Sequence, residues 1–343
     1  MMLIRPMKRM VVVGLGSIGQ RHVRNLLALG ISEITVLRQR NRAINDSGLL
    51  QKVKVCNDME ECLQSRPDAV IISNPTSLHI STAMSAAECG CHLFIEKPLS
   101  HNLDGINELQ KAIQDKGLIC HVGYQLRFHP CLQRIRTLLL ENKIGKVISV
   151  RAEVGQHLPD WHPWEDYRLS YSSCLDLGGG VILDLSHEVD YINWLFGPVR
   201  RLCCMMGKYS PLEIETEDTA EILMECERAP LVEVHLDYVQ RVPSRTCQII
   251  GSEGTIRWDY YSNQVSVLCA NPDATETYSH KGFERNEMYL AEMGHFLKCL
   301  DNHETPVVTF KDGRMALEIA MAARLSSKTG QTYRLASPLG ELK

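Results

Sequence analysis

Three polar side chains interrupt an otherwise apolar segment that runs from Gly178 to Tyr191 and reads G-G-G-V-I-L-D-L-S-H-E-V-D-Y. Asp184, His187 and Asp190 are spaced three residues apart, so on one continuous helix each step turns by only about 60° and all three share a side. An imidazole can exchange the proton of a hydroxyl group near neutral pH. The segment therefore predicts acid–base chemistry, with His187 as general acid or base and Asp184 orienting it or holding a substrate hydroxyl.

Two further interpretations of this segment remain open. Asp190 is predicted to be a structural partner, because paired polar groups on a half-buried helix often serve packing and capping. The three side chains could instead be ligands of a metal ion, but we expect no metal site here. Gly178, Gly179 and Gly180 are expected to let the backbone come close to a cofactor or substrate.

A glycine motif lies near the N-terminus, where the apolar run 10–13 meets G-x-G-x-x-G and a helical pattern follows. A second apolar run at 33–37 completes a strand, glycine turn, helix and strand within about 30 residues, as in dinucleotide-binding folds. The glycines would permit a tight turn, close approach of a pyrophosphate, and close packing of the helix, whose N-terminus faces the phosphates. The predicted nucleotide-binding residues of this turn are Gly14, Gly16, Ser17, Ile18 and Gly19.

The segment after the second predicted strand bears on the choice of nucleotide. An Asp or Glu about twenty residues beyond the glycines would bind the ribose hydroxyls of NAD, but the chain has L-R-Q-R-N-R at 37–42. Arginine suits a 2′-phosphate, so we expect NADP(H) to be preferred, with NAD(H) possible and Arg38 as the contact. The alternative is that these arginines simply point into water.

Strands and helices continue to alternate up to residue 123. This order predicts a doubly wound parallel sheet that binds its ligand at the carboxyl ends of the strands. Asn74 and Pro75 follow one predicted strand, whereas Glu96 and Lys97 follow the next and precede Pro98. The ammonium of Lys97 could polarise a substrate oxygen or lower the pKa of a hydroxyl that must lose its proton.

After residue 145 the pattern changes to strands, and two helical segments end the chain. Several strands alternate apolar and polar residues, so one sheet face is core and the other is available to water or a second subunit. We predict a nucleotide-binding domain over 1–122 and a substrate-binding and oligomerisation domain over 123–343, with the active site in a cleft between them. The later elements are predicted as strands at 147–154, 219–225, 231–239, 246–250, 255–260 and 265–268, and as helices at 284–300 and 312–327.

The loop at 158–171, L-P-D-W-H-P-W-E-D-Y-R-L-S-Y, is rich in aromatic residues. Its rings could pack as a hydrophobic plug, or they could stack on the C–H faces of a sugar while charged groups bind hydroxyls or phosphate. Two residues just past the last strand of the first domain are expected to face the same substrate. The predicted substrate-binding residues are Tyr124, Arg127, Trp161, Trp164, Tyr167 and Arg168.

Composition restricts the class of protein. The chain has 343 residues, 44% of them hydrophobic and 23% charged, with a net charge of −4, which favours neither nucleic acid nor an anionic membrane as a partner. Its apolar runs are too short to span a bilayer and its N-terminus does not look like a signal peptide, so we expect a cytoplasmic protein. The 13 cysteines are scattered without a C-x-x-C pair, which predicts reduced thiols packed as small apolar groups.

These motifs together resemble those of the Gfo/Idh/MocA oxidoreductases. The resemblance rests on the G-x-G-x-x-G turn, the segment H-I-S-T-A-M-S-A-A-E-C-G-C-H-L-F-I-E-K-P at 79–98, G-Y-Q-L-R-F-H-P at 123–130, and the segment from Gly178. It implies a Rossmann domain followed by an α/β domain with a large, open, mainly antiparallel sheet, whose exposed face commonly builds homodimers or homotetramers. His79 and Glu96 would then belong to the cofactor site, and Lys97 would match the lysine that assists hydride transfer.

The resemblance further implies hydride transfer between NAD(P) and a carbinol or carbonyl carbon of a sugar, nucleotide sugar or cyclitol. One departure is present: much of the family has D-x-G-x-H, whereas this chain has D-L-S-H from Asp184 to His187. The division of roles between these two residues therefore stays open. Two other functions are alternatives, an NAD-dependent glycoside hydrolase that works by oxidation and elimination, and a non-catalytic nucleotide-sensing regulator on the same fold.

Overall fold

The computed structural model describes residues 8–38, 48–270 and 275–335 and divides the chain into two compact units. The first holds the described residues up to Gln125 together with Arg285–Arg314, and the second holds Leu126–Glu284 and the described residues from Met315 on. Each unit is an α/β structure. The predicted fold class, a parallel Rossmann sheet plus a large and mainly antiparallel sheet, is confirmed.

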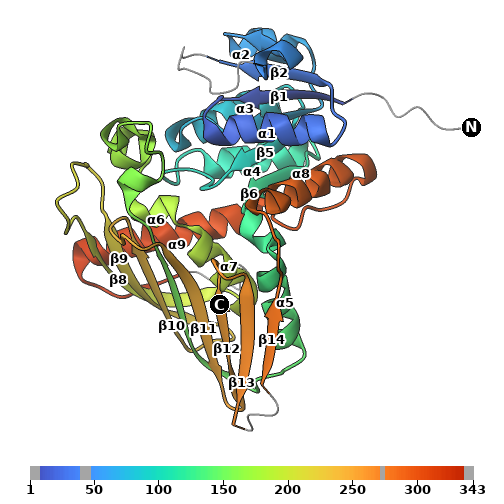
Figure 1. Ribbon diagram of the computed structural model, residues 1–343. Helices are drawn as coiled ribbons and strands as arrows, with labels where there is room; N and C mark the ends of the chain where they lie inside the picture. Colours follow the sequence, from blue (N-terminus) through green and yellow to red (C-terminus); the bar gives the residue numbers. More distant parts are fainter. Residues whose placement is uncertain (1–7, 39–47, 271–274, 336–343) are drawn as a thin grey trace, which may run out of the picture. The chain divides into compact units, whose positions relative to one another are not determined.

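The first unit contains a six-stranded sheet in the order β3-β2-β1-β4-β5-β6, in which every pair is parallel (Figure 1). The connection reverses direction between β1 and β4, and ligands of such sheets bind outside the carboxyl ends of the strands at this point. The strands are β1 (Arg9–Val13), β2 (Glu33–Leu37), β3 (Lys54–Cys56), β4 (Ala69–Ile72), β5 (His92–Glu96) and β6 (Cys120–Gly123).

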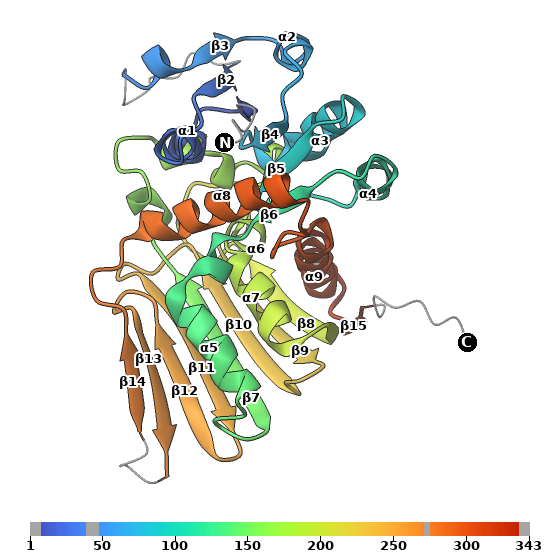
Figure 2. The same ribbon diagram turned by 90° about the vertical axis from the view of Figure 1, so that its right-hand side faces the viewer.

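Helices cover both faces of this sheet, with α1 and α8 in contact on one face and α3 and α4 in contact on the other (Figure 2). The core between α1, α8 and the strands includes Met293 and Phe296, both fully buried. Burial of such side chains contributes roughly 2 kcal/mol each. The helices are α1 (Ser17–Ala28), α2 (Met59–Gln64), α3 (His79–Glu88), α4 (Ile106–Asp115) and α8 (Arg285–Asn302).

The observed division of the chain differs from the predicted one in the place of α8. The sequence assigned everything after residue 122 to the second domain, whereas residues 285–314 belong to the first unit. The apolar side of α8 packs against the first sheet, so a segment more than 150 residues away in the chain completes that core. Helical periodicity shows that a face will be buried but does not show against which sheet.

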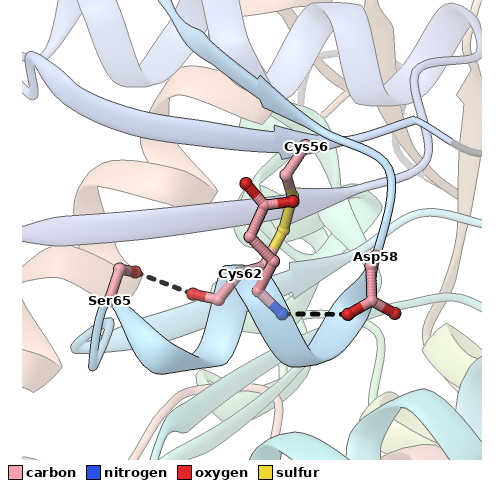
Figure 3. Close-up of a disulfide and its surroundings, with 5 residues drawn as sticks. Cys56, Asp58, Cys62 and Ser65 are labelled. Carbon is pink, nitrogen blue, oxygen red and sulfur yellow. Dashed lines mark hydrogen bonds between the residues drawn. A yellow bond between two sulfur atoms is a disulfide. The ribbon is translucent and has the colours of Figure 1, made fainter.

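Two cysteines form a disulfide, which corrects the prediction of reduced thiols for this pair. Cys56 ends β3 and Cys62 lies on α2, and their sulfur atoms are bonded (Figure 3). Asp58 caps α2 by accepting a hydrogen bond from the backbone N–H of Glu61 at 3.1 Å, which turns the chain back so that the helix faces the strand. The other cysteines are free thiols, and most of them are buried.

The second unit is built on a nine-stranded sheet in the order β14-β13-β12-β11-β7-β10-β9-β8-β15. Only the β7–β10 pair is parallel, and the other pairs are antiparallel. The strands are β7 (Val147–Gly155), β8 (Val199–Gly207), β9 (Thr219–Cys226), β10 (Leu231–Asp237), β11 (Ser244–Gly251), β12 (Gly254–Asp259), β13 (Gln264–Cys269), β14 (Glu276–Ser279) and β15 (Tyr333–Arg334).

One face of this sheet is core and the other is open, as the alternating sequence predicted. Ile222, Val234 and Trp258 point to the buried face, which α5 and α7 cover (Figure 2). Residues on the open face include Leu223, which is 47% exposed. The helices of the second unit are α5 (Pro130–Leu140), α6 (Val181–Asp184), α7 (His187–Phe196) and the part of α9 (Phe310–Thr329) from Met315 on. No helix in the described ranges is long and apolar enough to cross a lipid bilayer.

We expect the stability of the second unit to fall between neutral and alkaline pH because of His235. Its ring contacts the carboxylates of Asp237 at 2.9 Å and Glu221 at 2.5 Å, and these hydrogen bonds raise the pKa of His235 to about 9. A group whose pKa is higher in the folded state stabilises it fully below the unfolded value of about 6.5, and this stabilisation is lost as pH rises through 9. The side chain is 28% exposed, so we expect a loss of only about 2 kcal/mol.

Urea titrations at pH 6 and pH 10 would measure this effect. All four tryptophans lie in the second unit, so their fluorescence follows the unfolding of that unit. The variant His235→Gln should lack the part of this pH-dependent loss of unfolding free energy that comes from His235. If wild type and variant lose the same free energy over this range, the prediction is wrong.

Candidate functional site

The glycine turn of the first unit lies between β1 and α1. Gly14 has φ +90°, and a Cβ at this residue would lie 2.7 Å from the carbonyl oxygen of Ser73. A Cβ on Gly19 would lie 2.1 Å from the carbonyl oxygen of Gly14. The tight turn and the close helix packing predicted for these two glycines are therefore present, because neither position has room for a side chain.

Gly16 differs from its two neighbours in the motif. A Cβ built on it would meet nothing within 4 Å, so space is open beside its backbone. Gly16 is also the N-cap of α1, and having no side chain it leaves the first N–H groups of the helix to other partners. An open glycine at a helix N-terminus fits the phosphates of a dinucleotide. Ser17 and Ile18 form the first turn of this helix.

The chain segments after β4 and β5 are joined by a buried histidine. The ring of His79, which is 2% exposed, contacts the carbonyl oxygens of Pro98 at 2.9 Å and Asn74 at 3.0 Å. The pKa of His79 is below its usual value because burial disfavours the charged ring, and the hydrogen bonds to the two carbonyl oxygens offset this effect only in part. His79 thus holds together the two segments that were predicted to bind the cofactor. Pro75 lies in the first segment, where the side-chain amide of Asn74 donates to Thr82 at 2.9 Å.

Glu96 is the last residue of β5 and Lys97 directly follows the strand, and the two residues differ in exposure. Glu96 is 7% exposed, and its carboxylate contacts the ring of His22 at 2.7 Å. Lys97 is partly exposed. Arg38 follows β2 directly, and its backbone N–H donates to the carbonyl oxygen of Cys56 at 2.9 Å. The other arginines considered for the nucleotide, Arg40 and Arg42, lie outside the described residues.

In the second unit the segment from Gly178 is not one continuous helix, which corrects the prediction. α6 ends at Asp184 and α7 begins at His187, so the two residues flank a break at 185–186. Both side chains are nonetheless nearly buried, with exposures of 2% for Asp184 and 4% for His187. Ser186 belongs to the hydrogen bonds of both helices. Its backbone N–H donates to the carbonyl oxygen of Leu183 at 3.4 Å, and its own carbonyl oxygen accepts from the N–H of Asp190 at 3.0 Å.

Each acid of this segment has its own partner. Tyr238 donates its hydroxyl to Asp184 Oδ2 at 2.6 Å, and burial together with the neighbouring carboxylate raises the pKa of Tyr238 well above its usual value. Asp190 forms a buried, two-point ion pair with Arg127, at 3.0 Å to Nε and 2.6 Å to the terminal nitrogen. The structural role predicted for Asp190 is confirmed. Glu188 likewise pairs with Arg245 at 2.9 Å.

Two of the glycines before α6, Gly179 and Gly180, make room for protein atoms. A Cβ on Gly179 would lie 2.3 Å from the carbonyl oxygen of Tyr171, and one on Gly180 would lie 2.3 Å from the carboxylate of Glu217. Arg324 completes the arrangement by donating to the carbonyl oxygen of Gly179 and to Glu217, at 3.1 Å each. The turn is therefore a packed support for α6.

The predicted substrate residues differ widely in their surroundings. Trp161 packs edge-on against Tyr238 with ring centres 5.3 Å apart, whereas Trp164 is 65% exposed. Exposure of this size shows that the aromatic loop is not one hydrophobic plug. The hydroxyl of Tyr167 accepts from a backbone N–H, and the guanidinium of Arg168 is paired with two carboxylates.

Tyr124 and Arg127, the other two predicted substrate residues, are buried at 0% and 1% exposure. Since the guanidinium of Arg127 binds Asp190, the structure gives it a structural partner that the sequence did not predict. Sequence reasoning also missed His22 and Tyr238. A signal for Tyr238 was present, because it is a hydroxyl-bearing residue on the buried face at the end of a predicted strand. Among the described residues, no three His, Cys, Asp or Glu side chains are grouped so as to hold a metal ion.

Comparison with known proteins decides the family. A model described as an oxidoreductase family with an NAD-binding Rossmann fold matches residues 8–124, and the Gfo/Idh/MocA C-terminal domain matches residues 132–257. An uncharacterized oxidoreductase of Synechocystis sp. is 30% identical over 76% of this chain and 69% of its own length. The chain belongs to the Gfo/Idh/MocA oxidoreductase family. It is a nicotinamide-dependent oxidoreductase.

Two further relatives span nearly the whole chain. The scyllo-inositol 2-dehydrogenase (NAD(+)) of Bacillus subtilis is 27% identical over 95% of this chain and 96% of its own length. Among solved structures, levoglucosan dehydrogenase in complex with NADH has a TM-score of 0.86 and 19% identity, covering 96% of this chain and 99% of that one. At this identity the second comparison shows that the fold is shared.

Two glycine variants would separate packing from nucleotide binding in this family member. Gly19→Ala should lower stability by about 1–3 kcal/mol and weaken NADH binding at least tenfold, because its Cβ overlaps the backbone of Gly14. Gly16→Ala should leave stability within about 0.5 kcal/mol, because its Cβ meets no protein atom, yet should weaken binding through contact with the nucleotide. Calorimetric unfolding and titration of NADH fluorescence measure the two effects. Unchanged affinity in Gly16→Ala would contradict the assignment of this turn.

Proposed function

We propose that this protein transfers a hydride between a nicotinamide nucleotide and a carbinol or carbonyl carbon of a sugar, nucleotide sugar or cyclitol. The observation that carries the proposal is the buried pair formed by Tyr238 and Asp184, three residues before the buried His187, in a chain whose glycine turn fits a dinucleotide. The names of the relatives support the substrate class, since they include an inositol dehydrogenase and a levoglucosan dehydrogenase.

We assign the catalytic roles to Lys97, Asp184 and His187. The bound nucleotide supplies the hydride or accepts it. His187 exchanges the proton of the reacting hydroxyl, a task that suits an imidazole near neutral pH. The hydroxyl of Tyr238 orients the side chain of Asp184, and the nearly buried position of Asp184 lets it hold a substrate hydroxyl or His187 strongly. The ammonium of Lys97 stabilises negative charge on the reacting oxygen.

For binding, we retain the predicted nucleotide residues and divide the predicted substrate residues by exposure. Trp161, Trp164, Tyr167 and Arg168 are proposed to contact the substrate, because rings and charged groups on a partly exposed loop can stack on and bind a sugar. Tyr124 and Arg127 are buried, and we propose that they support the substrate-binding residues without contacting the substrate. The open face of the second sheet is proposed to form the interface of a homodimer or homotetramer in the cytoplasm.

A substrate panel tests this function. The purified protein would be mixed with NAD⁺ or NADP⁺ and with inositols, anhydrosugars, free sugars, sugar acids and nucleotide sugars, while the absorbance of reduced nicotinamide is followed. A steady rise with one compound, lost in Lys97→Ala, would support the dehydrogenase. Cleavage of a glycoside without net reduction of the nucleotide would favour the hydrolase. Tight nucleotide binding with no reaction at all would favour a sensor.

We further propose that NADP(H) is preferred over NAD(H) because of Arg38, which directly follows β2. One relative is named for NAD(+), so this preference would arise from residues of this chain. Arg38→Ala should weaken NADPH binding about tenfold or more and leave NADH binding within about twofold, since a bidentate arginine–phosphate contact is lost. Lys54→Ala, which removes an exposed cation from β3, is the control. An unchanged ratio of the two affinities in Arg38→Ala would contradict the proposal.

A further inference from the structure

The carboxylate of Glu96 connects the glycine-turn helix to the backbone of Lys97. One oxygen, Oε1, lies 2.7 Å from Nε2 of His22, a residue on α1 that is 0% exposed. The other oxygen, Oε2, accepts the backbone N–H of Lys97 at 3.2 Å. Both oxygens of this carboxylate are therefore held, one by a side chain of α1 and the other by the residue proposed to be catalytic.

The surroundings of this carboxylate leave it little freedom. A Cβ on Gly123 of β6 would lie 3.1 Å from Glu96 Oε2, so the glycine makes room for the carboxylate against the next strand. Glu96 is 7% exposed, and a nearly buried carboxylate that loses a hydrogen-bond donor cannot readily replace it with water. On the other side of Lys97, the ring of His79 contacts the carbonyl oxygen of Pro98 at 2.9 Å.

We infer that His22 is a positioning residue, which acts through Glu96 to fix Lys97 for the reaction. The inference rests on the proposed function of Lys97. His22 lies on α1, the helix whose N-terminus is proposed to bind the phosphates, so the contact joins the nucleotide-binding helix to the catalytic lysine. With His22 in place, the carboxylate of Glu96 contacts both the His22 ring and the backbone N–H of Lys97. Without it, Oε1 of Glu96 loses this partner and only the contact of Oε2 with the backbone N–H of Lys97 remains.

A second buried histidine provides a matched control. His121 on β6 contacts Glu292 at 3.1 Å, and both side chains are 0% exposed. Both histidines also pack on Phe94, with ring centres 5.1 Å away for His22 and 4.9 Å away for His121. The two histidine–glutamate pairs thus have similar burial and the same aromatic neighbour, and the glutamate of the first pair also accepts the backbone N–H of Lys97.

Competitive acetylation of Lys97 tests the inference without requiring turnover. The full-length protein would be labelled with acetic anhydride over a range of pH, and the modified peptide quantified by mass spectrometry. In His22→Leu the midpoint for Lys97 should rise by about one pH unit, because a less compensated carboxylate favours the charged ammonium. His22→Gln should restore the wild-type midpoint, since its amide nitrogen can take the place of Nε2. His121→Leu should leave the midpoint unchanged.

Kinetics provides the second measurement. In His22→Leu we expect kcat to fall at least tenfold, with KM and the Kd of the nucleotide within about threefold and with recovery in His22→Gln. An unchanged midpoint in His22→Leu, or an equal shift in His121→Leu, would overturn the inference. If His22→Leu does not fold, His22→Asn keeps a polar group but places its nitrogen away from Glu96, and it should show the same shift. The acetylation midpoint of Lys97 could also shift in a protein that turns over no substrate. That result would support the effect of His22 on Lys97 but would reject the proposed function.

Discussion

Replacing His187 by alanine is expected to lower the turnover number by 10² to 10⁴-fold, with little change in nucleotide affinity. A positioned general acid or base contributes on the order of this factor, because without it the proton of the reacting hydroxyl must pass to water. His187 begins α7 and is 4% exposed, close in sequence to Asp184, whose carboxylate is held by Tyr238. Steady-state turnover with the substrate found in the panel, and titration of NADH fluorescence, measure the two quantities.

The variant His187→Gln separates proton transfer from packing. Glutamine has a comparable size and can form hydrogen bonds, but it does not titrate. If His187 acts as an acid or base, turnover in His187→Gln should be as low as in His187→Ala. Recovery of turnover in the glutamine variant, or an equal loss of nucleotide binding in both variants, would show that His187 has a structural role.

The second large effect concerns stability. Replacing Asp190 by alanine is expected to lower the unfolding free energy of the second unit by about 3–5 kcal/mol, because it leaves the guanidinium of Arg127 buried without its carboxylate. Both side chains are almost inaccessible to water, at 2% exposure for Arg127 and 1% for Asp190. The charge that remains can be solvated only if the surrounding structure opens. Urea unfolding followed by tryptophan fluorescence reports on this unit, since all four tryptophans lie in it.

A double replacement provides the control for this prediction. Arg127→Met combined with Asp190→Leu removes both charges and keeps apolar volume, so it should be clearly more stable than Asp190→Ala alone. If the single and double variants lose the same free energy, lost packing and not an unpaired charge is the cause. A loss below about 1 kcal/mol in Asp190→Ala would contradict the role assigned to the ion pair.

The sequence by itself determined the parts of the protein that depend on local rules. The glycine turn was predictable because Gly14 needs a positive φ and Gly19 has no room for a side chain, and both requirements appear as residue types at fixed spacing. The two sheets were predictable because buried and half-buried strands have different periodicities. Lys97 was predictable as a candidate because it follows a strand directly.

Only the tertiary structure decided which partner each side chain has. Asp190 and Arg127 are 63 residues apart, and the spacing that placed Asp184, His187 and Asp190 on one predicted helix could not show the break at 185–186. The pairing of Cys56 with Cys62 was also decided by the turn into α2. The physical reason is common to all of these. Periodicity records whether a residue is buried, but the choice of its neighbour depends on how separate elements pack, which short-range sequence patterns do not encode.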